Sequence, residues 1–442
     1  MSQSLAATAV MRELQRGGFE AFLVGGCVRD IVLGRNPKDF DVTTNARPEQ
    51  VQAIFDRTLP VGVSFGVVIV LVDVSGVDHQ IEVATYRTDG QYSDGRRPDS
   101  VEYGTSAKDD VQRRDFTMNG LLIGDVETTD ENGEDLDYIR IFNNGMGGDT
   151  HTIVDHVGGF RDIQKKIIRC IGDPAARFAE DALRMLRAVR FAAQLGFDIE
   201  ENTLKAIEQH ASSLQNVSRE RVAMELYKMV SSPFPLKGLV PFVATGLANF
   251  ALPKTFLHTS RFAFTLQRFQ FTVPRDPILG MAMLLADSSY AVTREVCESL
   301  KLSKEDTEQI VGAVGLVDGL GDTFSYAPSG RKRLARRVGL SNALILFGQE
   351  PFIGKVKRSA HQAMEIELAY RSLTKEDIYP KPLVTGDDLI AAGLKPSPIF
   401  RDVLYMIETE QLDGILTDRE TALTCALEFA KNPPDRGFEG GA

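Results

Sequence analysis

The feature that most constrains this chain is a glycine pair between an apolar strand and a helix, followed by two carboxylates. The strand Phe22–Val24 runs into Gly25-Gly26, and Asp39 and Asp41 follow with one residue between them. Glycines at such a turn leave backbone N–H groups uncovered, which is how loops hold phosphates. Residues i and i+2 of a strand share a face, so the two carboxylates can share divalent metal ions. The pattern predicts nucleotidyl or phosphoryl transfer.

The composition indicates an ordinary globular chain of several domains. At 442 residues, 43% hydrophobic and 25% charged, it is too long for one compact domain. No apolar run approaches the roughly 20 residues of a membrane span, and the start lacks a signal sequence, so we expect no membrane association and a cytoplasmic location. The four cysteines show no C-x-x-C pairing, which argues against a disulfide framework or a zinc site.

Charge is unevenly distributed along the chain. The net charge of −11 argues against a general nucleic-acid coat. Residues 161–190 nevertheless carry eight basic side chains against four acidic ones, a local stripe that can hold phosphates. Residues 125–150 carry eight acidic side chains and one basic one, and we expect a mobile surface excursion from a strand pair there.

Hydrophobic periodicity predicts a small α/β head followed by helices. In the head, the pattern predicts helices at 5–17, 27–33 and 48–55, strands at 21–24 and 40–43, and a hairpin formed by 67–73 and 79–86. From Pro174 onward it predicts helices, among them 178–195, 203–210 and 222–229. The last ten residues, 433–442, are expected to be disordered.

The carboxylates are the first candidates for metal binding. Mg²⁺ prefers hard oxygen ligands, and two ions held by Asp39 and Asp41 would serve an attacking hydroxyl and a triphosphate leaving group. Without the glycine loop, the same pair would be two solvated acids at a strand edge. Glu82 alternates with buried positions on the next strand, so it is either a third ligand or an ordinary exposed strand residue.

Two groups of residues are candidates for binding the sugar and phosphates of a nucleotide. Arg29 lies on the first turn of the helix after the glycines and can face a triphosphate. Arg113 and Arg114 add guanidinium groups that match phosphate oxygens, and Asp115 or Asn119 can accept from a ribose hydroxyl. Taken alone, the second group is equally a structural salt-bridge cluster.

The predicted helix 178–195 carries candidates for reading a base. At roughly 100° per residue, Asp181 and Arg184 fall at the edge of the buried face and can project into one cleft. Arg187 and Arg190 fall on the opposite side, toward solvent or phosphate. A carboxylate that accepts from an exocyclic amino group, beside a guanidinium that donates to a ring nitrogen, admits C and A and refuses U and G. The alternative is a surface ion pair between Asp181 and Arg184.

Four motifs in this order resemble the class II tRNA nucleotidyltransferase (CCA-adding enzyme) and bacterial poly(A) polymerase family. The resemblance is close over residues 20–230, weak over 235–380, and returns over 382–424. The motifs are Phe22-Leu23-Val24-Gly25-Gly26-Cys27-Val28-Arg29-Asp30, Asp39-Phe40-Asp41, Arg113-Arg114-Asp115-Phe116-Thr117-Met118-Asn119 and Arg177-Phe178-Ala179-Glu180-Asp181-Ala182-Leu183-Arg184.

The resemblance implies an α+β fold class with four parts. A polymerase-β-like nucleotidyltransferase head, with a mixed or antiparallel sheet and helices, would span residues 1–160 and include the acidic insertion at about 127–150. All-helical parts would follow: a neck at 161–232 that recognises the base, a body at 233–380, and a tail at 381–432 that binds tRNA.

The resemblance also implies Mg²⁺-dependent, template-free addition of C, C and A to tRNA 3′ ends from CTP and ATP. Position by position, Asp39 and Asp41 would hold the metals, and Gly26 and Arg29 the triphosphate, on the loop that Gly25 opens. Arg114, with Arg113 as the alternate, would contact phosphate, and Asp115 and Asn119 would contact the ribose. Asp181 and Arg184 would read the base. Arg187 and Arg190 would support the nucleotide or the primer.

Three alternatives remain open from the sequence. An A-adding specialist or a poly(A) polymerase would share these head motifs, and a non-catalytic tRNA-binding relative would belong to another functional class. The segment 86–99 resembles the family's flexible loop for switching from CTP to ATP, which disfavours a CC-only enzyme. The basic segment expected of poly(A) polymerases is absent at 62–68. The intact Asp39 and Asp41 disfavour the non-catalytic relative.

Overall fold

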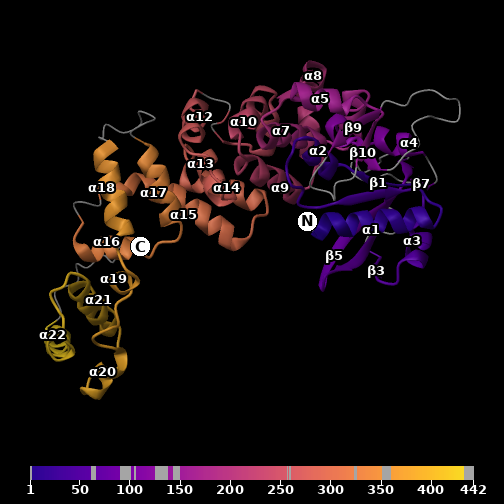
Figure 1. Cartoon of the computed structure of the whole chain (residues 1–442). Coiled ribbons are helices and arrows are strands. Elements are labelled where there is room, and N and C mark those ends of the chain that lie inside the picture. Colours follow the sequence, from indigo (N-terminus) through magenta and orange to yellow (C-terminus); the bar gives the residue numbers. More distant parts are fainter. Residues whose placement is uncertain are drawn as a thin grey trace. The chain divides into compact units, whose positions relative to one another are not determined.

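The computed structural model describes residues 2–60, 66–89, 101–103, 106–124, 138–142, 150–255, 257, 260–322, 326–350 and 360–432 (Figure 1). The chain divides by packing into two compact units. The first contains Met1–Ser260 and Val273–Pro277, and the second contains Arg261–Thr272 and Ile278–Ala442. The expected division into head, neck, body and tail stays a prediction.

A mixed sheet forms the core of the first unit. Its strands, among the described residues, are β1 (Ala21–Val24), β2 (Asp41–Thr44), β3 (Thr58–Leu59), β4 (Val67–Val74), β5 (Val77–Thr85), β8 (Leu121–Gly124), β9 (Tyr138–Phe142) and β10 (Thr150–Asp155). Their spatial order is β3-β4-β5-β2-β1-β8-β10-β9. The β2–β5 pair is parallel and the other neighbours are antiparallel. Strand β2 is therefore a central strand of the sheet, with β5 on one side and β1 on the other.

Local sequence signals explain the elements around this sheet. The expected hairpin is confirmed: β4 and β5 pair from Val67↔Ala84 to Val74↔Val77, and Ser75 and Gly76 both take positive φ in the turn. Helix α1 (Ser2–Arg16) packs against β1, β2, β4 and β5. Strand β1 is buried along its whole length, as its apolar sequence predicts.

Shorter elements complete the sheet-containing part. They are α2 (Gly26–Val32), α3 (Pro48–Ile54), α4 (Ala107–Gln112), η2 (Thr117–Asn119) and α5 (Gly159–Lys165), with the strand pairs β6 (Arg87–Asp89) with β7 (Val101–Tyr103) and β11 (Ile167–Ile168) with β12 (Asp198–Ile199).

The acidic insertion was expected to be a surface excursion. Its described part, β9, instead extends the sheet by pairing with β10 from Thr150↔Phe142 to Val154↔Tyr138. Backbone pairing at an open sheet edge explains this, because it needs no apolar side-chain pattern. The rest of the insertion, most of the loop at 86–99, residues 61–65 and the tail from 433 lie outside the described residues.

Helices follow the sheet within the first unit. They are α6 (Pro174–Glu180), α7 (Leu183–Leu195), α8 (Glu201–His210), η3 (Ala211–Asn216), α9 (Arg219–Val230), α10 (Pro235–Ala244) and α11 (Leu247–Ala251). Helix α7 packs on α9 and α10 through a buried face that includes Met185, Leu186 and Val189. The single helix expected at 178–195 is wrong: the chain breaks at Asp181, which is extended with φ −146° and ψ 103°.

The described part of the second unit consists of helices and their connections. They are α12 (Phe262–Phe271), α13 (Pro277–Leu285), α14 (Tyr290–Ser299), α15 (Lys304–Leu320), α16 (Pro328–Leu334), α17 (Leu340–Gln349), α18 (Ala360–Arg371), α19 (Lys375–Ile378), α20 (Gly386–Ala391), α21 (Ile399–Leu412) and α22 (Arg419–Lys431). The expected fold class, a sheet-containing head followed by helices, is confirmed. Within the described ranges, no helix is long and apolar enough to cross a membrane.

Candidate active site

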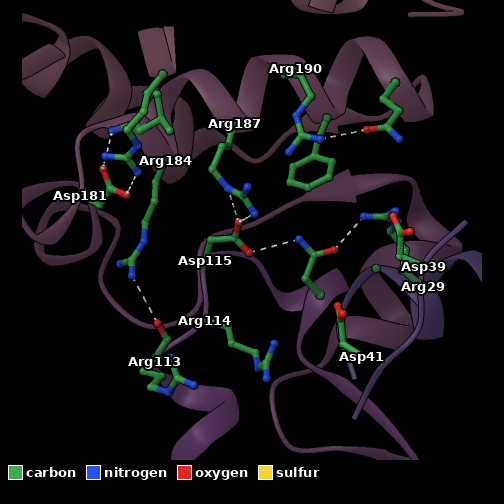
Figure 2. Close-up of a pocket in the computed structure, with 17 residues that line it drawn as sticks. Arg29, Asp39, Asp41, Arg113, Arg114, Asp115, Asp181, Arg184, Arg187 and Arg190 are labelled. Atoms are coloured by element: carbon green, nitrogen blue, oxygen red, sulfur yellow. Dashed lines mark hydrogen bonds and ion pairs between the residues drawn. The ribbon is translucent and has the colours of Figure 1, made fainter. Parts of the chain in front are cut away.

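A polar cavity of about 620 Å³ lies in the first unit (Figure 2). Its lining contains both aspartates of the expected metal site and every residue expected to bind the nucleotide. The residues that line it are Gly25, Gly26, Arg29, Asp39, Asp41, Arg113, Arg114, Asp115, Asn119, Asp181, Leu183, Arg184, Arg187, Arg190, Phe191, Gln194 and Arg221. Residues separated by up to about 200 positions therefore meet at one place.

The glycine loop lies close to one of the two carboxylates expected to bind metal. Gly25 has φ 82° and ψ −135°, a conformation that favours glycine, and it precedes the first residue of α2. A Cβ on Gly25 would lie 3.7 Å from both Asp41 Oδ2 and an Arg114 guanidinium nitrogen. Any side chain at this position would therefore enter the space between the Asp41 carboxylate and the Arg114 guanidinium.

The carboxylates on and before β2 fit a divalent cation. Asp41 is paired in register with Val24 of β1 and with Glu82 of β5, and Asp39 is exposed to the cavity. Burial, then repulsion from Glu82, raises the pKa of Asp41 to about 6 against the opposing effect of Arg114. A cation bound between hard oxygen donors would remove this repulsion, so the donor set suits Mg²⁺.

Glu82 is placed differently from Asp39 and Asp41. It is exposed beside Asp41 but does not line the cavity. Across the described residues, no group of three acidic, histidine or cysteine side chains has a metal-binding arrangement. The third-ligand role of Glu82 therefore gains no support from this geometry and stays a prediction.

Arg113 and Arg114 are anchored by a buried carboxylate that the sequence analysis did not single out. Asp110 on α4 is fully buried and pairs with Arg113 at 2.5 Å and with Arg114 at 2.9 Å. Burial opposes ionisation of Asp110, but the two guanidinium groups lower its pKa below the ordinary value. Asp110 thus holds the side chains of both arginines in position at the cavity.

Asp115 is the centre of a hydrogen-bond network across the cavity. Its Oδ2 accepts from Arg187 Nε at 2.8 Å and Nη2 at 2.5 Å, while its Oδ1 accepts from the Phe116 backbone N–H and from Asn119. Asn119 in turn accepts from Arg29 at 2.9 Å, so the network continues to the glycine loop. Figure 2 shows this chain of contacts from Arg187 to Arg29.

This network bears on the ribose contact expected of Asp115, which stays a prediction. A carboxylate has about four acceptor positions, and four donors already occupy those of Asp115. Burial would raise the pKa of Asp115, but Arg187 and Asn119 lower it to about 2. In this arrangement Asp115 orients Arg187 and Asn119.

Three guanidinium groups surround the ring of Phe191. Arg190 lies 3.7 Å from the ring centroid, Arg29 5.2 Å and Arg187 5.4 Å. Cation–π contacts of this kind help to hold like charges close together. Arg190 also pairs with the buried Glu225 at 2.9 Å, and burial lowers its pKa to about 10. The cluster thus brings three guanidinium groups to one wall of the cavity, each of them paired with a carboxylate: Asp30, Asp115 or Glu225.

The helical wheel placed these residues only in part. Arg187 and Arg190 were expected opposite the buried face, toward solvent or phosphate; both line the cavity, but Arg190 is itself buried. Asp181 and Arg184 were considered as an ion pair on one helix, but the helix breaks between them. Asp181 pairs instead with Arg221, at 2.7 Å, and Arg184 pairs with Glu180.

The sequence analysis missed several lining residues: Leu183, Phe191, Gln194 and Arg221. Helical spacing could have found two of them. Phe191 and Gln194 continue the pattern set by Arg184 and Arg187 at steps of three and four residues along α7. Arg221 comes from α9, and only the packing of α9 on α7 brings it to the cavity.

Comparison with known proteins agrees with this geometry. Residues 21–169 match the family described as "Poly A polymerase head domain", and residues 196–257 match "Probable RNA and SrmB- binding site of polymerase A". The crystal structure of the Bacillus stearothermophilus CCA-adding enzyme in complex with CTP has a TM-score of 0.66 and 27% identity, and the match covers 98% of each chain.

Two relatives match along almost their entire length. The CCA-adding enzyme of Limosilactobacillus fermentum is 33% identical over 96% of this chain and 97% of its own. The CCA-adding enzyme of Limosilactobacillus reuteri is 39% identical over 96% of both chains. On these similarities, and on a cavity that unites the expected carboxylates and arginines, the chain belongs to the family of CCA-adding enzymes.

Proposed function

We propose that this chain adds C, C and A to the 3′ end of tRNA from CTP and ATP, without a nucleic-acid template. The observation that carries the proposal is the convergence of Asp39 and Asp41 with Asp181 and Arg184 on one arginine-rich cavity. A metal-binding pair supplies the chemistry of nucleotidyl transfer, while the second pair supplies a protein surface that can select a base. Because the proposed substrates are tRNA, CTP and ATP, we place the reaction in the cytoplasm.

The proposed reaction forms one phosphodiester bond in each step. The 3′-hydroxyl of the tRNA attacks the α-phosphate of the nucleotide, and the bond to the β-phosphate breaks, with pyrophosphate leaving. Two Mg²⁺ ions bound to Asp39 and Asp41 would activate the hydroxyl and offset the charge of the leaving group. The Arg29, Arg187 and Arg190 guanidiniums orient the triphosphate by hydrogen bonds to its oxygens.

Base selection follows from hydrogen-bond chemistry. The Asp181 carboxylate accepts from the exocyclic amino group that C and A share, and Arg184 donates to the neighbouring ring nitrogen. U and G present a carbonyl oxygen to the carboxylate and an N–H to the guanidinium. Both contacts would then be repulsive, so U and G are refused.

An incorporation assay tests the proposal directly. Purified protein with Mg²⁺, CTP, ATP and a tRNA that lacks its CCA end should yield the sequence C-C-A, and chelation of Mg²⁺ should stop the reaction. Asp39→Asn and Asp41→Asn should each reduce the rate by at least about a thousandfold, because one metal-binding carboxylate is lost. Asp56→Asn, at an exposed site outside the cavity, is the matched control and should retain activity.

The same assay separates the alternatives. Addition of A alone would identify an A-adding specialist, and long A tails on unrelated RNA would identify a poly(A) polymerase. Binding of tRNA without any incorporation would identify a non-catalytic relative. Any of these three results would contradict the proposed product.

A further inference from the structure

Arg221 makes a two-point contact with the carboxylate proposed to read the base. Its Nη1 donates to Asp181 Oδ1 at 3.3 Å and its Nη2 donates to Oδ2 at 2.7 Å. Only 23% of the Arg221 side chain and 14% of the Asp181 side chain are exposed. A planar guanidinium that meets both oxygens of a carboxylate fixes the orientation of the carboxylate as well as its position.

The remaining contacts of Asp181 leave it little capacity for other donors. Its Oδ1 also accepts from the Leu183 backbone N–H at 3.0 Å, at the start of α7. Of about four acceptor positions on a carboxylate, three are therefore occupied. One position is left, on Oδ2, which matches the single hydrogen bond that an exocyclic amino group would donate.

The arginine of the base-reading pair is held by a different set of contacts. Arg184 pairs with Glu180 and donates to the Arg177 carbonyl oxygen at 3.1 Å. Asp181 is fixed from α9, and Arg184 is fixed from α6 and by the Arg113 carbonyl oxygen at 3.4 Å, so the two groups have separate supports. Separate supports keep the Asp181 carboxylate and the Arg184 guanidinium apart, whereas a direct ion pair would bring the two groups into contact with each other.

We propose that Arg221 is a positioning residue for base selection, acting through Asp181; this inference rests on the proposed function. A carboxylate free to turn or shift by about one ring position could accept from the ring N–H of U or G, which stands next to the carbonyl. The Arg221 fork prevents that movement. Refusal of U and G therefore depends on Arg221 as well as on Asp181 and Arg184.

Replacement of Arg221 tests the inference through nucleotide selection. In single-turnover assays with a tRNA that lacks CCA, the ratio of kcat/KM for CTP to that for UTP should fall at least about tenfold in Arg221→Met. In Arg221→Lys this ratio should fall by less, because lysine keeps the charge but cannot form the two-point contact. Lys228→Met, which removes a charge from an exposed site on the same helix, should keep the wild-type ratio.

A double-mutant cycle shows whether Arg221 acts through Asp181. If it does, Asp181→Ala alone should abolish most of the selection, and adding Arg221→Met should change the CTP-to-UTP ratio no further. A purely structural Arg221 would lower the rates with both nucleotides equally and leave the ratio unchanged.

The outcomes separate this inference from the proposed function. Wild-type protein that adds neither C nor A to tRNA would contradict the proposed function itself. Wild-type protein that adds C-C-A, with an Arg221→Met ratio equal to wild type, would overturn only the role of Arg221. If thermal unfolding shows that Arg221→Met does not fold, the Arg221→Lys ratio decides in the same way: a lowered ratio supports the inference and an unchanged ratio overturns it.

Discussion

At the scale of single residues, the cavity depends on buried carboxylates that hold its arginines in place. Asp115 fixes Arg187, and Asp110 fixes Arg113 and Arg114. Each of these acids is almost or completely buried. Removal of one partner from a buried ion pair leaves a charge without compensation, so these acids matter for stability as well as for geometry.

The lowered pKa of Asp115 predicts a specific pH dependence of stability. The pKa falls from 3.8 to about 2 on folding, so ionised Asp115 stabilises the folded state at pH values above its unfolded pKa. The contribution is about 2 kcal/mol at neutral pH and is lost as the pH falls from about 4 through 2. Asp115→Asn should therefore lower the free energy of unfolding most at neutral pH.

Urea unfolding of wild type and Asp115→Asn at pH values of about 7, 5, 4 and 3 measures this difference. The difference should be constant between pH about 7 and 5 and should shrink below about 4. Asp56→Asn, an exposed acid in the same unit, should show no such trend. A difference that grows on acidification would contradict the assigned direction.

At the scale of secondary structure, glycine in α10 determines how closely α10 approaches α7. A Cβ on Gly238 would lie 2.6 Å from the Val189 carbonyl oxygen and 2.8 Å from Ala193 Cβ. Backbone cannot yield as a flexible side chain does, so Gly238→Ala should destabilise the first unit by about 1–3 kcal/mol. Because α7 carries Arg187, Arg190 and Phe191, nucleotide incorporation should weaken as well.

Thermal unfolding and incorporation kinetics of the glycine variants provide the check. Gly319→Ala in α15 is the matched control, since a Cβ there would meet no atom within 4 Å. Alanine is favoured over glycine inside a helix, so this control should be neutral or more stable by up to about 1 kcal/mol. Equal stability of the two variants would show that α10 can move away from α7 without cost.

The elements also show how much the sequence could predict. Strand β1, the hairpin β4–β5 and the carboxylates Asp39 and Asp41 follow from local patterns and were expected. The break at Asp181 was not, because no glycine or proline marks it. It depends on the Asp181 side chain, which accepts from the Leu183 N–H and pairs with Arg221. The Leu183 contact is local, of the kind that a capping aspartate makes, whereas the Arg221 contact is tertiary and no single-sequence periodicity contains it.

At the scale of the whole molecule, an acidic chain is proposed to bind a polyanion. The net charge is −11, so tRNA binding must depend on local basic surfaces. The cavity of the first unit is one such surface. In the second unit, α16 and the residues that follow it carry Arg331, Lys332, Arg333, Arg336 and Arg337. These cations differ in how far the protein itself already neutralises them.

Contacts within the second unit divide these cations into two sets. Arg333 and Arg336 both pair with Glu408, and Lys332 donates to the Leu412 carbonyl oxygen. For Arg331 and Arg337 the described residues provide no ion pair, and Arg337 is exposed. Among the described residues, Arg331 and Arg337 are thus the members of this group that no ion pair neutralises.

We therefore predict that the double variant Arg331→Ala, Arg337→Ala binds tRNA more weakly, with a shallower dependence on salt. Each lost phosphate contact should reduce the slope of log affinity against log salt concentration by about 0.7–0.9. The KM for CTP should stay unchanged, because the described residues that line the cavity all belong to the first unit. Fluorescence anisotropy with labelled tRNA over a salt series measures the slope.

The control double variant Lys205→Ala, Lys237→Ala removes two cations already paired with Glu201 and Asp198, and its slope should match wild type. An unchanged slope in the arginine variant would place the phosphate contacts on other basic residues.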